Sequence, residues 1–182
     1  MKTDIKKIVV ALFVSAVLFV GCSDDENPTG PENLPATANV KVVHASPDAP
    51  GVDLLVDDKV AGSNLTYPNN TGYLEVTKGT RNVKVNVAGT STTVVEANLD
   101  LEADINYSVF ATDAVANLTP IVIQDDLSAP TSGNAHARFI HLSPNAPAVD
   151  ITLTDGTVVF GNIKFQEYTA FTHYPLQHMI FK

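Results

Sequence analysis

The chain has 182 residues, of which 11 are basic and 20 acidic, and its formal net charge at pH 7 is −9. A surface this acidic repels phosphate backbones, so nucleic acid is excluded as a partner. The length suits one complete β-domain of about 100 residues plus part of another.

The first 21 residues have the pattern of an export signal. Three lysines lie within Met1–Lys7, and the apolar run Ile8–Val20 follows, interrupted only by Ser15. Its thirteen residues are too few to span a bilayer as a helix but are typical of a signal-peptide core. The run ends in Phe-Val-Gly before Cys22, the single cysteine, which resembles the lipobox of bacterial lipoproteins with Phe19 in place of the usual leucine. The resemblance implies cleavage before a lipidated Cys22; the alternative is an uncleaved short anchor.

Residues 22–36 are expected to form a flexible acidic tether. Cleavage before Cys22 removes three lysines and one aspartate, which leaves eight basic and 19 acidic residues and a net charge of −11. Between Cys22 and Pro35 only Leu34 is apolar, so the segment cannot bury enough surface to fold. The tether starts with Ser23, Asp24, Asp25 and Glu26. These residues resemble an outer-membrane sorting signal followed by a surface-export signal of lipoproteins, which implies a membrane partner through the lipid anchor and exposure at the bacterial cell surface. The alternative is a merely solvated start to the tether.

Beyond the tether, apolar residues recur with period two, which is typical of half-buried strands. Val83, Val85 and Val87 alternate with polar residues, and no stretch shows a helical stripe. Strands are expected near 38–45, 52–56, 73–77, 82–88, 92–99, 106–112 and 119–124. Seven short strands in about 90 residues predict an all-β fold, an immunoglobulin-like β-sandwich. Tyr107, which follows Asp104, resembles a tyrosine corner, in which the hydroxyl bonds back to the backbone of the corner.

An eleven-residue motif occurs twice, 97 residues apart. Val43–Asp53 and Ile140–Asp150 are identical at seven positions, and weaker matches follow up to Tyr73 and Phe171. The first copy continues through four further expected strands, and the last three of them have no counterpart after the second copy. We therefore expect one complete domain and a partial second copy, either because the sequence is a fragment of a longer protein or because another chain completes the half-domain. The expected organisation is a signal peptide over 1–21, the tether over 22–36, a first sandwich over 37–126, a linker over 127–135 and a truncated second sandwich over 136–182.

The repeated pattern H-x-S-P-x-A-P-x-V-D resembles that of the domain-of-unknown-function family 4397, which carries it once per domain and often in tandem. It falls on His44, Ser46, Pro47, Pro50 and Asp53, and again on His141, Ser143, Pro144, Pro147 and Asp150. The resemblance implies secreted or lipid-anchored bacterial proteins with immunoglobulin-like β-domains. It implies no activity.

The motif itself predicts a rigid bend between the first two strands. Two prolines three residues apart fix two φ angles and remove two backbone donors. Ser46 and Asp53 can bond to the free backbone groups of the bend, and His44 is expected to bond Asp53 across it. Catalysis by these three side chains is the alternative. It is disfavoured because Ser46 precedes Pro47, which has no N–H for an oxyanion hole, and because no G-x-S-x-G occurs. We expect no catalytic residue and no enzyme activity.

Neither a metal nor a cofactor is expected. Three pairs of carboxylates lie at expected turns. Their side chains are expected to be solvated, because no calcium-loop pattern accompanies them, and a calcium ion at one of these turns is the alternative. The pairs are Asp57 with Asp58, Asp100 with Glu102, and Asp125 with Asp126. His173 and His178 do not have the spacing of a zinc site.

The expected function is therefore non-catalytic. A lipid-anchored β-sandwich in the cell envelope suits a surface binding or adhesion module for a glycan or protein ligand that the sequence does not identify. Loops at the end of the sandwich are the expected contact sites, especially Tyr67–Tyr73. The alternative is a structural spacer or envelope scaffold without a ligand of its own.

Overall fold

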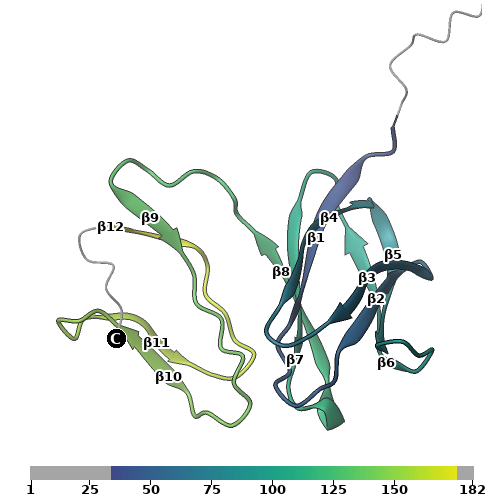
Figure 1. Cartoon of the computed structure of the whole chain (residues 1–182). Helices are drawn as coiled ribbons and strands as arrows, with labels where there is room; N and C mark the ends of the chain where they lie inside the picture. Colours follow the sequence, from purple (N-terminus) through teal and green to yellow (C-terminus); the bar gives the residue numbers. More distant parts are fainter. Residues whose placement is uncertain (1–33, 176–182) are drawn as a thin grey trace, which may run out of the picture. The chain divides into compact units, whose positions relative to one another are not determined.

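The computed structural model describes residues 34–175, which belong to one compact unit (Figure 1). These residues form twelve β-strands and one short 3-10 turn and contain no α-helix, so the all-β prediction is confirmed. The strands are β1 (Thr37–His44), β2 (Val52–Val56), β3 (Lys59–Leu65), β4 (Asn70–Thr77), β5 (Gly79–Val87), β6 (Thr93–Leu101), β7 (Asn106–Thr112), β8 (Thr119–Asp125), β9 (Asn134–Ala137), β10 (Val149–Thr152), β11 (Val158–Ile163) and β12 (Thr172–Pro175), and the turn η1 is Val115–Asn117. No helix in this range is long and apolar enough to cross a membrane.

The first eight strands form a sandwich of two four-stranded sheets, which we call the N-terminal sandwich (residues 37–125). The sheet orders are β4-β1-β7-β8 and β3-β2-β5-β6. β1 runs parallel to β7, and the other neighbours are antiparallel. Because β1 and β2 lie in different sheets, the proline-rich bend between them carries the chain from one layer to the other.

The seven expected strands are all present, and β3 is an eighth that the sequence did not predict. Its sequence, K-V-A-G-S-N-L, does not alternate between apolar and polar residues. The pairing of β3 with β2 shifts register twice, and the exposure of successive residues does not alternate either. Asn64, near its end, adopts a left-handed φ of 49°. The bulged geometry removes the period-two signal on which strand prediction depends.

The core lies between the two sheets. Ala38, Val40 and Val42 face inward from β1, and Val83 and Val85 face them from β5. Every second residue of β1 is buried, as period two requires. The tyrosine corner is also confirmed, because the buried Tyr107 hydroxyl accepts a hydrogen bond from the Glu102 N–H at 3.2 Å, next to Asp104 with its left-handed φ of 62°.

The remaining four strands form two separate pairs, β12-β9 and β10-β11. We call residues 126–175 the C-terminal segment. The ring of Phe160 on β11 packs edge-on against Tyr174 of β12, with centroids 5.7 Å apart, so the two pairs lie against each other. The buried apolar side chains of the described residues all fall between Ala38 and Ile123. The C-terminal segment therefore has strands but no buried apolar core of its own.

Candidate functional site

The first bend, residues 45–51, is held by His44 at the end of β1. This side chain is only 1% exposed, and its Nε2 donates to the carbonyl oxygen of Pro50 at 3.0 Å. A carbonyl can only accept, so Nε2 carries the ring hydrogen and Nδ1 is an acceptor, which among the described residues has no hydrogen-bond partner.

The predicted hydrogen bond between His44 and Asp53 is wrong. His44 continues the inward-facing row of β1, whereas Asp53 lies between the buried residues Val52 and Leu54 of β2 and so points outward. Strand alternation thus separates the two side chains, although the bend brings their backbones close.

The Asp53 carboxylate instead joins three parts of the sandwich. It accepts hydrogen bonds from the Asn64 N–H at the end of β3 and from the Gly89 N–H in the β5–β6 turn, both at 2.8 Å. These bonds, that of Asn64 first, hold the pKa of Asp53 below its ordinary value. Gly89 has a φ of +74°, which disfavours any side chain at this position.

Ser46 is fully buried and also has its own partner. Its hydroxyl donates to the Asp48 carboxylate at 3.3 Å, and the same carboxylate oxygen accepts the Val115 N–H of η1 at 2.9 Å. Ser46, His44 and Asp53 are therefore not joined into a hydrogen-bonded triad.

The second bend, residues 142–148, repeats these contacts. His141 is buried, and its Nε2 donates to the carbonyl of Pro147 at 3.1 Å. Asp150 accepts the N–H of Asn162 at 2.6 Å, as Asp53 does from Asn64. One difference is that the Ser143 N–H donates to His141 Nδ1 at 3.3 Å, so this imidazole has both nitrogens bonded.

Equivalent contacts continue beyond the bends. The N–H of each histidine donates to a turn carbonyl at 3.0 Å, and a threonine hydroxyl accepts the N–H two residues before each histidine at 3.0 Å. The pairs are His44–Asn69 and His141–Glu167, and then Val42–Thr71 and Phe139–Thr169. A cation also lies 4.7 Å from an aromatic centroid in each copy, Lys41 over Tyr73 and Arg138 over Phe171. The sequence repeat is thus a repeat of local structure.

Both bends line one groove of about 320 Å³. The residues around it are Val43, His44, Ala45, Pro47, Tyr67, Pro68, Leu142, Ser143 and Pro144. Tyr67 belongs to the loop expected to make contacts, is 48% exposed and precedes a cis peptide bond to Pro68. Thr37 and His44 are the first and last residues of β1, and His44, which lines the groove, lies roughly 23 Å from Thr37 along the strand. The groove therefore lies at the end of the sandwich opposite the point where the chain enters it.

A second polar cluster, around Asp125, was not predicted. Its carboxylate was expected to be solvated, but the side chain is 2% exposed. One oxygen accepts the hydroxyls of Tyr73 and Ser108, both at 2.5 Å, and the other binds the Arg138 guanidinium, which also donates to the Gln124 carbonyl at 2.9 Å. Burial first, and the Asp125 bond second, raise the pKa of Tyr73 to about 12.

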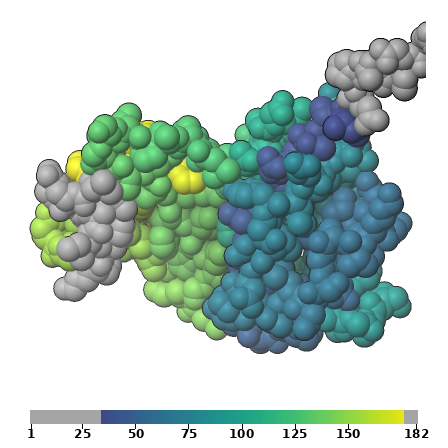
Figure 2. Space-filling model, turned by 45° about the horizontal axis from the view of Figure 1, so that its top comes forward, coloured from purple at the N-terminus to yellow at the C-terminus, as the bar shows by residue number. Residues whose placement is uncertain are grey.

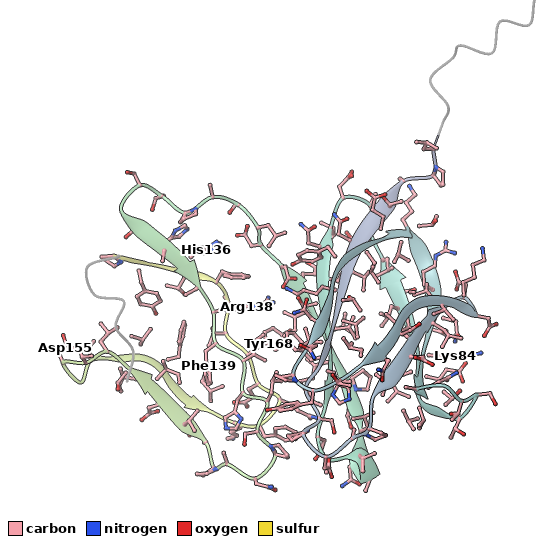
Figure 3. The ribbon with its side chains drawn as sticks, viewed as in Figure 1. Lys84, His136, Arg138, Phe139, Asp155 and Tyr168 are labelled. Atoms are coloured by element: carbon pink, nitrogen blue, oxygen red, sulfur yellow. The ribbon has the colours of Figure 1, made fainter. Side chains whose placement is uncertain are left out.

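The Asp125 cluster joins the C-terminal segment to the outer face of the sheet β4-β1-β7-β8. Arg138 and Tyr168 lie on the side of the segment nearest β8 in Figure 3, and the two regions meet in the space-filling view of Figure 2. Gln166 adds a bond to the buried Thr112 hydroxyl at 3.1 Å. The alternation of Ile121, Ile123 and Asp125 on β8 is the sequence signal that places Asp125 on this covered face.

The other carboxylate pairs behave as surface groups. Asp57 binds Arg81 at 3.1 Å and Asp58 binds Lys84 at 2.6 Å. The Arg81 bond, followed by the Asn82 N–H, lowers the pKa of Asp57. Within residues 34–175 no three histidine, cysteine or acidic side chains are grouped so as to hold a metal ion. Cys22, Ser23, Asp24, Asp25, Glu26 and His178 lie outside the described residues.

The fold and the bend together define an all-β sandwich protein with a duplicated histidine–proline bend. Residues 38–152, more than half of the chain, match the family described as Domain of unknown function (DUF4397). The chain belongs to this family. A comparison with curated proteins gives no match.

Proposed function

We propose that this protein is a non-catalytic, lipid-anchored module of the bacterial cell envelope that binds a surface ligand through the groove between its two bends. In this proposal residues 1–21 direct export, Cys22 carries the lipid, and residues 22–36 form the tether. Residues 37–126 are one complete family domain, and residues 136–182 are a partial tandem copy. The observation that carries the proposal is the position of the groove at the end of the sandwich opposite residue 37.

The lining of the groove suits a polypeptide ligand. Apolar side chains and prolines form most of it, and the half-exposed ring of Tyr67 is an amphipathic contact of the kind enriched in binding sites. The prolines and the His44–Pro50 bond fix the backbone around it, so little conformational entropy is lost on binding. No charged side chain lines the groove, so binding depends little on salt.

Binding is tested on protein and glycan arrays with residues 22–182 carrying Cys22→Ser. Tyr67→Ala and Leu142→Ser should each weaken binding of the captured ligand about tenfold, because each removes apolar contact area from the groove. Val60→Ser is the matched control, since Val60 is 65% exposed on β3 and does not line the groove. A ligand that binds all three variants equally, or the absence of any ligand, favours the structural-spacer function instead.

Anchoring is tested separately in cells. Cys22→Ala should leave an unprocessed precursor that incorporates no fatty-acid probe. Replacing Asp24, Asp25 and Glu26 by alanine should keep the lipid label but protect the chain from protease added to intact cells. Equal labelling of the Cys22→Ala variant contradicts lipidation, and unchanged protease access contradicts the export role of the acidic cluster.

A further inference from the structure

A cavity of about 380 Å³ lies between β8 and the C-terminal segment, and we call it the β8 cavity. It is lined by residues 123–126 at the end of β8, by Arg138 and by residues 168–171 before β12. None of these residues lines the groove between the two bends. Pockets for small ligands have volumes of about 300–1,000 Å³, so the cavity has room for a ligand of its own.

The most buried charges of this lining are those of the Asp125–Arg138 ion pair. The two side chains are 2% and 10% exposed. The Arg138 guanidinium also lies 4.7 Å from the centroid of the Phe171 ring, so it is held from two sides. An arginine has five N–H donors, and among the described residues two groups accept from Arg138, the Gln124 carbonyl and the Asp125 carboxylate. The cavity thus borders a fixed cation with further donors.

Two half-exposed side chains of the lining are open to a ligand. Tyr168 is 49% exposed, and it lies with Arg138 on the side of the C-terminal segment nearest β8 (Figure 3). The Asp126 side chain is 54% exposed. The Ser128 hydroxyl and then the Ser128 N–H lower the pKa of Asp126, so this carboxylate is an ionised acceptor at neutral pH. The cavity therefore combines an aromatic ring, acceptors and donors.

The aromatic ring of Tyr168 is not needed to form the local structure. Tyr168 pairs with Ile140, and the first copy has the same pairing between Asn70 and Val43. Ile140 and Val43 are equivalent residues of the repeated motif, so Tyr168 corresponds to Asn70. Because an asparagine suffices at this position in the first copy, a half-exposed tyrosine in the second points to a contact with a ligand.

We propose that the β8 cavity binds a neutral sugar residue of a glycan. The Tyr168 ring packs against the apolar face of the sugar, and Asp126 and Arg138 bond to its hydroxyl groups. A sugar ring has a face of C–H groups, and its hydroxyls both donate and accept, so it matches an aromatic ring beside a carboxylate and a guanidinium.

Other classes of ligand fit the cavity less well. The carboxylates of Asp125 and Asp126 repel an anion, and the fixed guanidinium of Arg138 repels a cation. An apolar ligand would take water from these charged groups without replacing its hydrogen bonds. The proposal depends neither on the lipid anchor nor on ligand binding by the groove.

The test uses residues 22–182 with Cys22→Ser, and its probes are the methyl glycosides of glucose, galactose, mannose and N-acetylglucosamine. Saturation-transfer-difference NMR detects binding of each glycoside, and titration of its signals gives the affinity. Tyr168→Ala removes the aromatic contact, and Tyr168→Phe keeps it. Tyr67→Ala is the matched control, because Tyr67 is 48% exposed, as Tyr168 nearly is, but lines the groove.

We expect at least one glycoside to bind. Tyr168→Ala should weaken its binding about tenfold, whereas Tyr168→Phe and Tyr67→Ala should leave the affinity nearly unchanged. Asp126→Asn should also weaken binding, since it exchanges a charged acceptor for an amide.

Three results overturn the proposal. The first is that none of the glycosides binds. The second is that Tyr67→Ala weakens binding as much as Tyr168→Ala, because the sugar then occupies the groove. The third is that N-acetyl-lysine methylamide binds and no glycoside does, because the cavity then takes a cation.

Discussion

At the scale of single residues, Asp53 shows how one carboxylate organises the end of a sandwich. Its two oxygens bind backbone donors from β3 and from the β5–β6 turn. An asparagine side chain in its place has one oxygen and one NH2 group. The NH2 group carries two donor hydrogens and would face a backbone N–H, which is itself a donor, so Asp53→Asn loses at least one of these bonds.

We predict that Asp53→Asn lowers the melting temperature at pH 7 and that the difference from the native chain shrinks in acid. The folded pKa of Asp53 lies below its unfolded value because of the Asn64 and Gly89 N–H groups. Its stabilising effect is therefore complete above the unfolded pKa, about 3.9, and is lost as the pH falls through the folded pKa. Circular-dichroism melts at pH 7, 5 and 3 measure it. Glu75→Gln, an exposed site, is the control, and an equal loss at all three pH values contradicts the prediction.

The buried imidazole of His44 gives a second residue-scale prediction. His44→Ala removes the hydrogen bond to Pro50 and leaves a void in a fully packed position, so the free energy of unfolding should fall by about 2–3 kcal/mol. Urea denaturation measures the change. His173→Ala, at an exposed position of β12, should change it by less than about 1 kcal/mol. If the two variants lose equal stability, the His44 bond does not hold the first bend.

Residue partners were harder to predict from the sequence than residue roles. The proline bend and the Tyr107 corner follow from local geometry, and both are present. The partner of His44 was missed because it depends on which face of each strand a side chain occupies. Asp125 was missed because its burial comes from residues as distant as Arg138, a contact that no local pattern encodes.

At the scale of elements, the alternating strands were predictable and the bulged one was not. β2 and β7 begin and end at the expected residues. Short alternating or continuous apolar runs bounded by turn residues are compatible with few structures other than a strand. β3 lacks alternation because its register shifts against β2. The position of the C-terminal segment on the β8 side of the sandwich could not be predicted from the sequence either. It depends on the ion pair between Asp125 of β8 and Arg138 of the C-terminal segment.

That charged pair makes a prediction at the element scale. Arg138→Ala leaves the Asp125 carboxylate, 2% exposed, without its cation, so the free energy of unfolding should fall by about 3 kcal/mol or more. Arg81→Ala is the matched control, because it breaks an exposed ion pair with Asp57 and should cost less than about 1 kcal/mol through that pair. Urea denaturation of both variants measures the difference, and equal losses mean that Arg138 does not fasten the segment to the sheet.

At the scale of the whole molecule, the same local structure occurs twice in different surroundings. The bends at His44 and His141 share their hydrogen bonds, yet within residues 34–175 only the first bend belongs to a sandwich with a filled core. A bend can thus form from local bonds alone, whereas the stability of the strands that it joins depends on apolar side chains brought by later strands.

The last prediction concerns how protection from solvent is distributed along the chain. In dilute solution, backbone amides in β2, β5 and β7 should exchange hydrogen slowly, because both neighbours of each strand are present and the core between the sheets is buried. Amides in β9–β12 should exchange much faster, because among the described residues these strands occur in pairs and enclose no buried apolar side chain. Mass-spectrometric hydrogen exchange in dilute solution measures the difference. Equal protection of the two halves means that the C-terminal segment closes its own core within one chain.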